Sequence, residues 1–150
     1  MKNPPGSRGI KEYAFALLGR RDYTESRLRE KLKKRQYRDA DIGPVLGYLR
    51  SLKVLDDAGF AFRYAVSRIS SKPRGPELID FELAKKGIER SVRKTVLGKV
   101  FREHPESEVA SSALKKKFRK TAGREVAYRF LKRRGFSSAV ISEILDRDNG

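Results

Sequence analysis

Apolar residues recur along this chain with the spacing of one face of an α-helix. They begin at Ile10, Ala14, Leu17 and Leu18, and a similar three- and four-residue spacing returns in eight later segments. No stretch alternates apolar and polar residues over the length of a strand, so no β-sheet is needed to place the apolar residues. The pattern therefore predicts an all-α protein of nine helices.

Polar and helix-breaking residues mark where several of these helices start. Thr24 can cap the second helix with its hydroxyl, and Asp56 or Asp57 can cap the fourth with a carboxylate. Pro44 stands close to the start of the third helix. We expect Pro44 in the first turn of that helix, because a residue there has no intrahelical N–H bond to lose.

Three predicted helix ends share a six-residue pattern, at 32–37 (LKKRQY), 83–88 (LAKKGI) and 131–136 (LKRRGF). In this pattern the leucine packs inward, the basic residues face the helix C-terminus and solvent, and the glycine takes the left-handed conformation that ends a helix. Gln36 replaces the glycine in the first copy, so we expect that helix to end differently. We call these copies the repeated segments.

The repeated segments divide the chain into three tandem units. Each copy is followed by another apolar helix, so the nine helices form three copies of a three-helix unit. We expect a flexible tail at 1–9 and three-helix repeats at 10–54, 55–104 and 105–150. Units of this kind stack into an elongated, helix-turn-helix-like array.

The net charge of the chain indicates the chemistry of its partner. The chain has 36 Lys and Arg against 19 Asp and Glu, a net charge of +17. Consecutive fifty-residue segments carry +7, +5 and +5, so the positive charge belongs to the folded surface and not to one tail. The composition therefore predicts an acidic partner, with nucleic acid as the first candidate.

Several kinds of site lack the residues they require. The chain has no cysteine, which excludes disulfides, thiolate zinc sites and cysteine nucleophiles. Asp56 and Asp57 would point ~100° apart on a helix, and no phosphate-binding glycine loop is present. We therefore expect no enzyme, no cofactor and no metal. No apolar run approaches the ~18–20 residues of a membrane span, so we expect no membrane contact and a cytoplasmic location.

The ordered set of motifs resembles the RecX family of bacterial recombination regulators. The motifs that carry the resemblance are the three repeated segments, Leu55-Asp56-Asp57, Phe60-Ala61, Tyr64-Ala65, Gly75-Pro76 and Phe130-Leu131. Together they cover roughly residues 11–147, nearly the whole chain.

The resemblance implies a curved all-helical protein of three three-helix repeats that lodges in the groove of the RecA filament on single-stranded DNA. There it would inhibit RecA ATP hydrolysis, strand exchange and coprotease activity, and so modulate recombination, DNA repair and the SOS response. We expect a monomer that acts by steric exclusion.

The basic residues at helix ends and in loops are the candidates for contact with the filament or with DNA phosphates. The densest stretch runs from Lys115 to Arg134, with ten Lys or Arg and one acid, Glu125. Lys72 and Arg74 fall in a predicted loop that we expect to be exposed. The candidate residues are Lys33, Lys34, Arg35, Lys72, Arg74, Lys85, Lys86, Lys115, Lys116, Lys117, Arg119, Lys120, Arg124, Lys132, Arg133 and Arg134.

Two other interpretations stay open for these residues. A helix spreads consecutive residues around its axis, so part of the basic run is expected to be solvated surface. A direct DNA-binding protein of tandem helix-turn-helix-like units would carry the same net charge.

Overall fold

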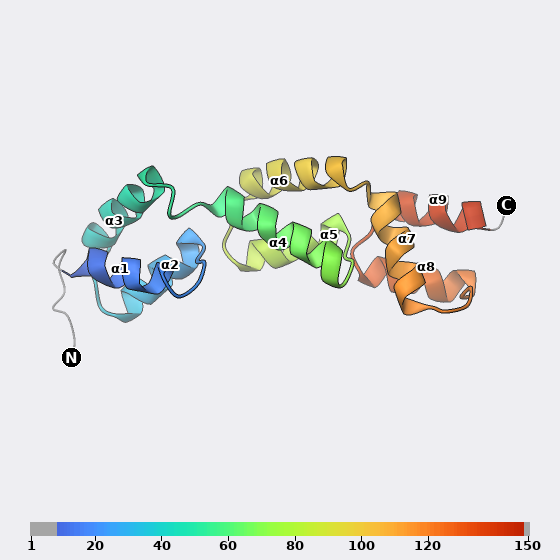
Figure 1. The fold of residues 1–150 in the computed structure, drawn as a ribbon, viewed down its shortest axis with the longest axis horizontal. Helices are drawn as coiled ribbons and strands as arrows, with labels where there is room; N and C mark the ends of the chain where they lie inside the picture. Colours follow the sequence, from blue (N-terminus) through green and yellow to red (C-terminus); the bar gives the residue numbers. More distant parts are fainter. Residues whose placement is uncertain (1–8, 149–150) are drawn as a thin grey trace.

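The computed structural model describes residues 9–148, and all regular structure in that range is helical (Figure 1). The helices are α1 (Ile10–Leu18), α2 (Glu25–Lys34), α3 (Asp39–Ser51), α4 (Asp57–Ser71), α5 (Pro76–Lys85), α6 (Arg90–Glu103), α7 (Glu106–Lys117), α8 (Arg124–Arg133) and α9 (Ser138–Asp148). The predicted all-α fold is confirmed. Apart from Gly9, the predicted tail lies outside the described residues.

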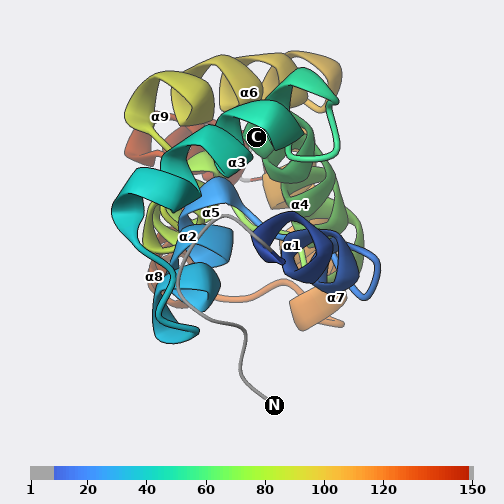
Figure 2. The same ribbon diagram turned by 90° about the vertical axis from the view of Figure 1, so that its left-hand side faces the viewer.

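The helices lie in three consecutive groups along the long axis, α1–α3, α4–α6 and α7–α9 (Figure 1). Helices pack most closely against partners of their own group. Seen end-on, the corresponding helices of the groups gather together, with α3, α6 and α9 along the top (Figure 2). The molecule is therefore an elongated array of similarly built groups.

Each group buries its own apolar core. Leu46 is fully buried in the first core, Leu83 in the second and Phe136 in the third. Burying such a side chain contributes roughly 1.5–3 kcal/mol. Ile69 and Phe101 pack against both the second and the third cores, which links those two groups.

Two helix starts agree with the sequence and one does not. The Thr24 hydroxyl caps α2, and the Asp56 carboxylate caps α4. Pro44 is the sixth residue of α3, so its predicted place in the first turn is wrong. Its missing N–H leaves the carbonyl of Ala40 without an intrahelical partner, and both residues are exposed, so water can replace that bond.

The three repeated segments end their helices in the same way. Gln36, Gly87 and Gly135 have φ of 71°, 83° and 90°. In each segment the N–H of the sixth residue donates to the carbonyl of the leading leucine at 3.2–3.3 Å, which defines a Schellman motif. The expectation that Gln36 would end its helix differently is therefore wrong, because glutamine adopts the left-handed conformation at a cost of roughly 1–2 kcal/mol.

The second and third groups join end to end through α8 and α5. The N–H of Gly75 donates to the carbonyl of Arg134 at 2.7 Å, and the N–H of Glu77 donates to the carbonyl of Gly135 at 3.0 Å. Lys132 forms an ion pair with Glu77 at 3.7 Å. A Cβ on Gly75 would lie closer than 3.0 Å to the Gly135 carbonyl. The carbonyls left unpaired at the C-terminus of α8 thus accept hydrogen bonds from the amides left unpaired at the start of α5.

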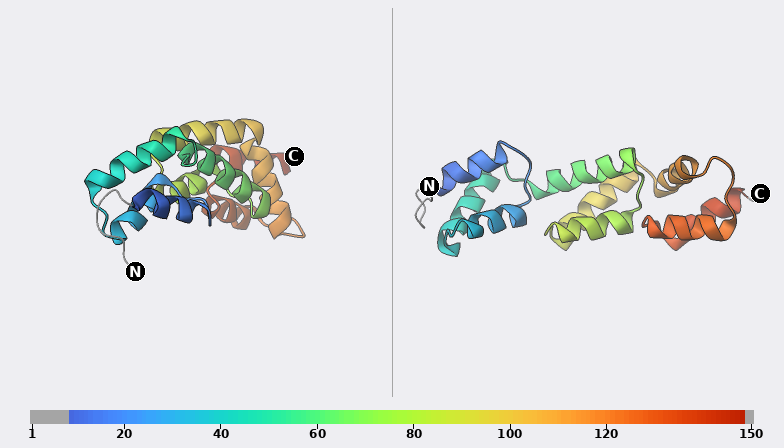
Figure 3. Two further views of the ribbon diagram at one scale, coloured as in Figure 1. Left: turned by 60° about the vertical axis from the view of Figure 1, so that its left-hand side comes forward. Right: turned by 90° about the horizontal axis from the view of Figure 1, so that it is seen from below.

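The first and second groups join through α5 and α2 in a related way. The Thr24 hydroxyl donates to the carbonyl of Lys86 at 3.0 Å and accepts from the N–H of Arg27 at 3.2 Å. A Cβ on Gly87 would lie closer than 3.0 Å to the Ser26 side chain. As a result α8, α5 and α2 follow one another head to tail along one edge (Figures 1 and 3). We call them the middle-helix row.

Gly135→Ala is expected to lower the free energy of unfolding by at least about 2 kcal/mol, because the new Cβ would press on the Leu78 backbone at a positive φ. Gln36→Gly, at the equivalent position without a following helix, is expected to cause no loss, because glycine removes the left-handed strain of about 1–2 kcal/mol and costs only about 0.5–1 kcal/mol of backbone entropy. Urea unfolding followed by circular dichroism measures both. Equal losses would show that the close approach is not what requires glycine.

Candidate functional site

The last basic residue of each repeated segment stacks on an aromatic ring. Arg35 lies over the Tyr13 ring at 4.2 Å, and Lys86 lies over the Tyr64 ring at 5.1 Å. Arg134 lies 4.8 Å from the centroid of the Phe130 ring. These cation–π contacts hold the three charges against the protein surface.

The second residue of each repeated segment, where it is a lysine, forms an ion pair with an acidic side chain. Lys33 pairs with Asp39 at 3.6 Å, and Lys132 pairs with Glu77 across the junction. Alanine occupies this position in the middle segment. The second position therefore adds little uncompensated charge to the surface.

The third residue of each segment is an exposed cation. Lys34, Lys85 and Arg133 are the last residues of α2, α5 and α8, and none forms an ion pair with a described side chain. Each middle helix has 10 residues, a length of ~15 Å. Because the middle helices run head to tail, these residues form a spaced line of positive charge along one edge. We call them the cationic row.

A second group of cations lies at the α7–α8 end of the array. The exposed residues Lys115, Lys117, Arg119 and Lys120 form no ion pair with the described side chains, and we call them the end cluster. Three of them line a cavity of about 380 Å³ together with Arg124, which pairs with Asp146 at 2.9 Å, and the apolar side chains of Leu114, Phe118 and Leu145. Uncompensated positive charge at this density attracts phosphate.

Two candidates lie inside the junction between the second and third groups. Arg74 pairs with Glu82, and the Arg134 guanidinium donates to the Pro73 carbonyl at 2.9 Å. Burial lowers the pKa of Arg134 below its ordinary value, and the neighbouring charge of Arg74 lowers it further. Pro73 and Gly75 are buried, so the expectation of an exposed loop here is wrong beyond Lys72. Docking of α8 covers this segment.

Lys116 and Lys72 lie near the same junction. Lys116 Nζ donates to the Ser70 carbonyl at 3.2 Å, which joins α7 to the end of α4. Lys72 is exposed and forms no ion pair within the described part of the chain. The sixteen candidates therefore divide into exposed cations without an ion pair, cations paired or stacked within their own group, and cations at a junction between groups.

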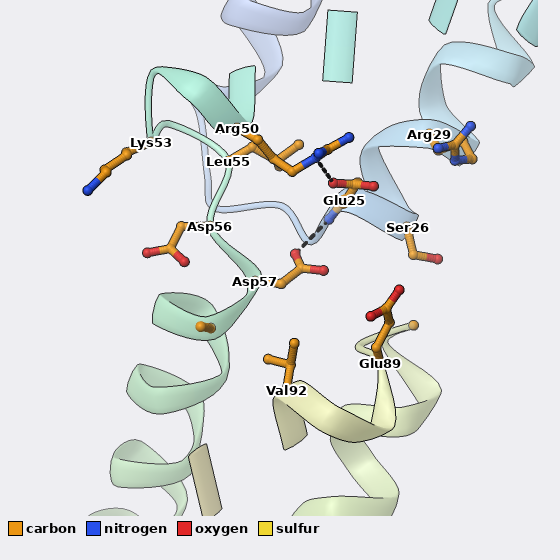
Figure 4. Close-up of a pocket in the computed structure, with 12 residues that line it drawn as sticks. Glu25, Ser26, Arg29, Arg50, Lys53, Leu55, Asp56, Asp57, Glu89 and Val92 are labelled. Atoms are coloured by element: carbon orange, nitrogen blue, oxygen red, sulfur yellow. Dashed lines mark hydrogen bonds and ion pairs between the residues drawn. The ribbon is translucent and has the colours of Figure 1, made fainter. Parts of the chain in front are cut away.

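A groove of about 810 Å³ between the first two groups differs in charge from the rest of the surface (Figure 4). The Asp57 carboxylate accepts from the N–H of Glu25 at 2.8 Å, while the Glu25 side chain pairs with Arg50 at 2.7 Å. Asp57 thus caps α2 from the neighbouring group. The sequence does not predict this role, because the two residues are 32 positions apart and no local pattern connects them.

Burial raises the pKa of Asp57 above its ordinary value, and the charges of Glu25, Asp56 and Glu89 raise it further, against the lowering effect of the Glu25 N–H. Figure 4 shows Glu25, Asp56, Asp57 and Glu89 around the same groove. Arg29, Arg50 and Lys53 line the groove beside these four carboxylates, so its charges are nearly balanced. The cationic row and the end cluster, by contrast, carry uncompensated positive charge, and they are the better candidates for contact with DNA.

Other kinds of site find no support in residues 9–148. No group of three or more His, Cys, Asp or Glu side chains there could hold a metal ion. None of the helices described is long and apolar enough to span a membrane.

Comparison with known proteins gives the family. Models of the RecX first and second three-helix domains match residues 11–49 and 56–97. Regulatory protein RecX of Chlorobium phaeobacteroides strain BS1 is 33% identical over 141 residues, which cover 91% of each chain. The chain belongs to the RecX family. The two matched domains correspond to α1–α3 and to most of α4–α6.

Solved RecX structures have the same arrangement of helices. A crystal structure of regulatory protein RecX superposes with a TM-score of 0.80 at 28% identity, covering 93% of this chain and 73% of the other. The fold of RecX from Lactobacillus salivarius matches with a TM-score of 0.82 at 19% identity, covering 94% and 95%. The resemblance to the RecX family noted in the sequence is confirmed.

Asp57→Asn keeps an acceptor oxygen for the Glu25 N–H but cannot ionise. Because the folded-state pKa of Asp57 is raised, its ionisation costs stability as the pH rises through that pKa. The free energy of unfolding of Asp57→Asn, relative to the original chain, is therefore expected to rise as the pH increases above about 4, the ordinary pKa of an aspartate. Urea unfolding at several pH values measures this difference. A difference that stays flat or falls would contradict the burial of this carboxylate.

Proposed function

We propose that this RecX-family chain binds the RecA filament on single-stranded DNA and inhibits RecA ATP hydrolysis, strand exchange and coprotease activity. The observation that carries the proposal is the cationic row, in which Lys34, Lys85 and Arg133 recur once per group along one edge of an elongated array. A filament presents its acidic groups at regular intervals, so a protein with regularly spaced cations can contact several intervals at once.

In this proposal the repeats at 10–54, 55–104 and 105–150 contact the filament as successive units. Leu55, the first residue of the second repeat, packs with the core of the first. Arg134 and Lys116 donate to carbonyls of the second group, and these contacts help to hold the second and third groups in one elongated body. The end cluster provides the phosphate contacts, because its four exposed cations have no ion-pair partner among the described residues.

Inhibition by this arrangement is steric. A chain that bridges neighbouring RecA subunits hinders the movements that accompany ATP turnover, and its bulk in the groove excludes a second DNA. The protein contributes no catalytic residue and no cofactor to this process. It acts as a monomer in the cytoplasm, where it meets the filament.

A direct DNA-binding function is the second candidate, and α6 favours it. Its residues Arg90, Lys94 and Arg102 are exposed and form no ion pair with other described side chains. They belong to α6, which lies with α3 and α9 along the top edge in Figure 2, whereas the middle-helix row lies below. A duplex bound on that edge would use a different set of cations from a filament bound on the row.

Replacing the cationic row by Lys34→Glu, Lys85→Glu and Arg133→Glu together is expected to raise the concentration needed for half-inhibition of RecA ATP hydrolysis at least about tenfold. The reason is that three attractive contacts become repulsive. The measurement is a titration of RecA ATP hydrolysis on single-stranded DNA, with helicity checked by circular dichroism.

The matched control reverses three cations elsewhere, by Lys53→Glu, Lys94→Glu and Arg102→Glu. Lys53 follows the end of α3 and, like the two α6 residues, is exposed and forms no ion pair with the described side chains. It makes the same change in net charge and is expected to leave inhibition nearly intact. An equal or larger loss in the control would assign contact to the opposite edge. Two results together would favour direct DNA binding, the second candidate. ATP hydrolysis would stay unchanged with an excess of the original protein, and the protein would bind a free duplex with sequence selectivity and resistance to salt.

A further inference from the structure

The free N-terminus of α8 repeats the surface that α5 offers to α8. Residues 123–126 (GREV) match residues 75–78 (GPEL), with a glycine cap and a glutamate at the second helical position in both. Nothing lies within 4 Å of a Cβ built on Gly123, and Val126 is 47% exposed. In the part of the chain described, the N-terminal half of the junction, whose backbone amides donate the hydrogen bonds, is thus uncovered at this end.

The free C-terminus of α2, at the other end of the array, repeats the C-terminal half of the junction, whose carbonyls accept the hydrogen bonds. Lys33 corresponds to Lys132, which pairs with Glu77, and Arg35 corresponds to Arg134, whose carbonyl accepts from the Gly75 N–H. If the α2 end of one copy met the α8 end of another, Lys33, which pairs with Asp39 in its own copy, would face Glu125, which pairs with Arg129. Both pairs are exposed, so the two side chains can exchange partners. The two ends are therefore complementary in charge and in hydrogen bonding.

Gln36 is the residue at which the α2 end differs from the two helix ends that dock. A Cβ on Gly135 would lie closer than 3.0 Å to the Leu78 backbone nitrogen, and a Cβ on Gly87 would come equally close to Ser26. Both internal junctions therefore exclude a side chain at this position. Gln36 carries a side chain there, and its helix end is one that no following helix covers in residues 9–148.

We propose that Gln36 prevents copies of this chain from stacking end to end. Without the Gln36 side chain, the α2 end of one copy docks on the α8 end of the next in the geometry of the α5–α8 junction. Such a contact joins two different surfaces and continues the long axis, so it produces open chains of copies instead of closed dimers. A few hydrogen bonds and one ion pair make a weak contact, so association is strongest at high protein concentration.

The test is sedimentation velocity of Gln36→Gly over a wide range of concentration. Its weight-average sedimentation coefficient is expected to rise with concentration, while the original chain and Gln36→Ala stay constant. Alanine is the matched control because it shortens the side chain but keeps the Cβ that collides. No association of Gln36→Gly, or equal association of Gln36→Ala or of the original chain, would overturn the proposal.

Variants at the α8 end locate the contact. In the Gln36→Gly background, Gly123→Val is expected to abolish association, because the valine side chain fills the place where the helix end would dock. Glu125→Lys is expected to weaken association by opposing Lys33, and the added change Lys33→Glu is expected to restore it. Association that survives Gly123→Val, or that the charge exchange fails to restore, would show that copies meet through another surface.

Discussion

The end of one helix docked on the start of the next is the contact on which the rest of this structure depends. At a helix C-terminus carbonyl groups have no intrahelical partner, and at an N-terminus amides have none. Here the carbonyls of Arg134 and Gly135 accept from the amides at the start of α5. The left-handed cap turns these carbonyls toward the neighbouring group, and the close approach requires glycine where a helix follows.

The left-handed helix caps also determine where the basic residues of each group lie. Because a basic stretch precedes each left-handed residue, every group carries cations at the same place relative to its neighbour. One cation is held by an aromatic ring and another, where present, by an acid. Lys34, Lys85 and Arg133 form no ion pair with the described side chains, and of these Lys85 lies over the exposed Phe81 ring at 5.1 Å. The net charge of +17 is thus divided between cations that hold the array together and cations left for a partner.

Local patterns predicted the features that depend on local forces. Apolar spacing predicted the helices, and Thr24 and Asp56 were predicted as caps because capping acts within a few residues. Arg74 and Arg134 looked like surface cations because only the folded array brings them together. The left-handed Gln36 was missed because glycine in the other copies reflects close packing with a neighbouring group as well as backbone preference.

A density map of this chain bound to the RecA filament on single-stranded DNA tests the proposed use of this architecture most directly. Our account predicts that the edge formed by α2, α5 and α8 faces the filament, with Lys34, Lys85 and Arg133 each opposite an acidic side chain or a phosphate. A map in which the edge formed by α3, α6 and α9 faces the filament, and the cationic row faces solvent, would contradict it.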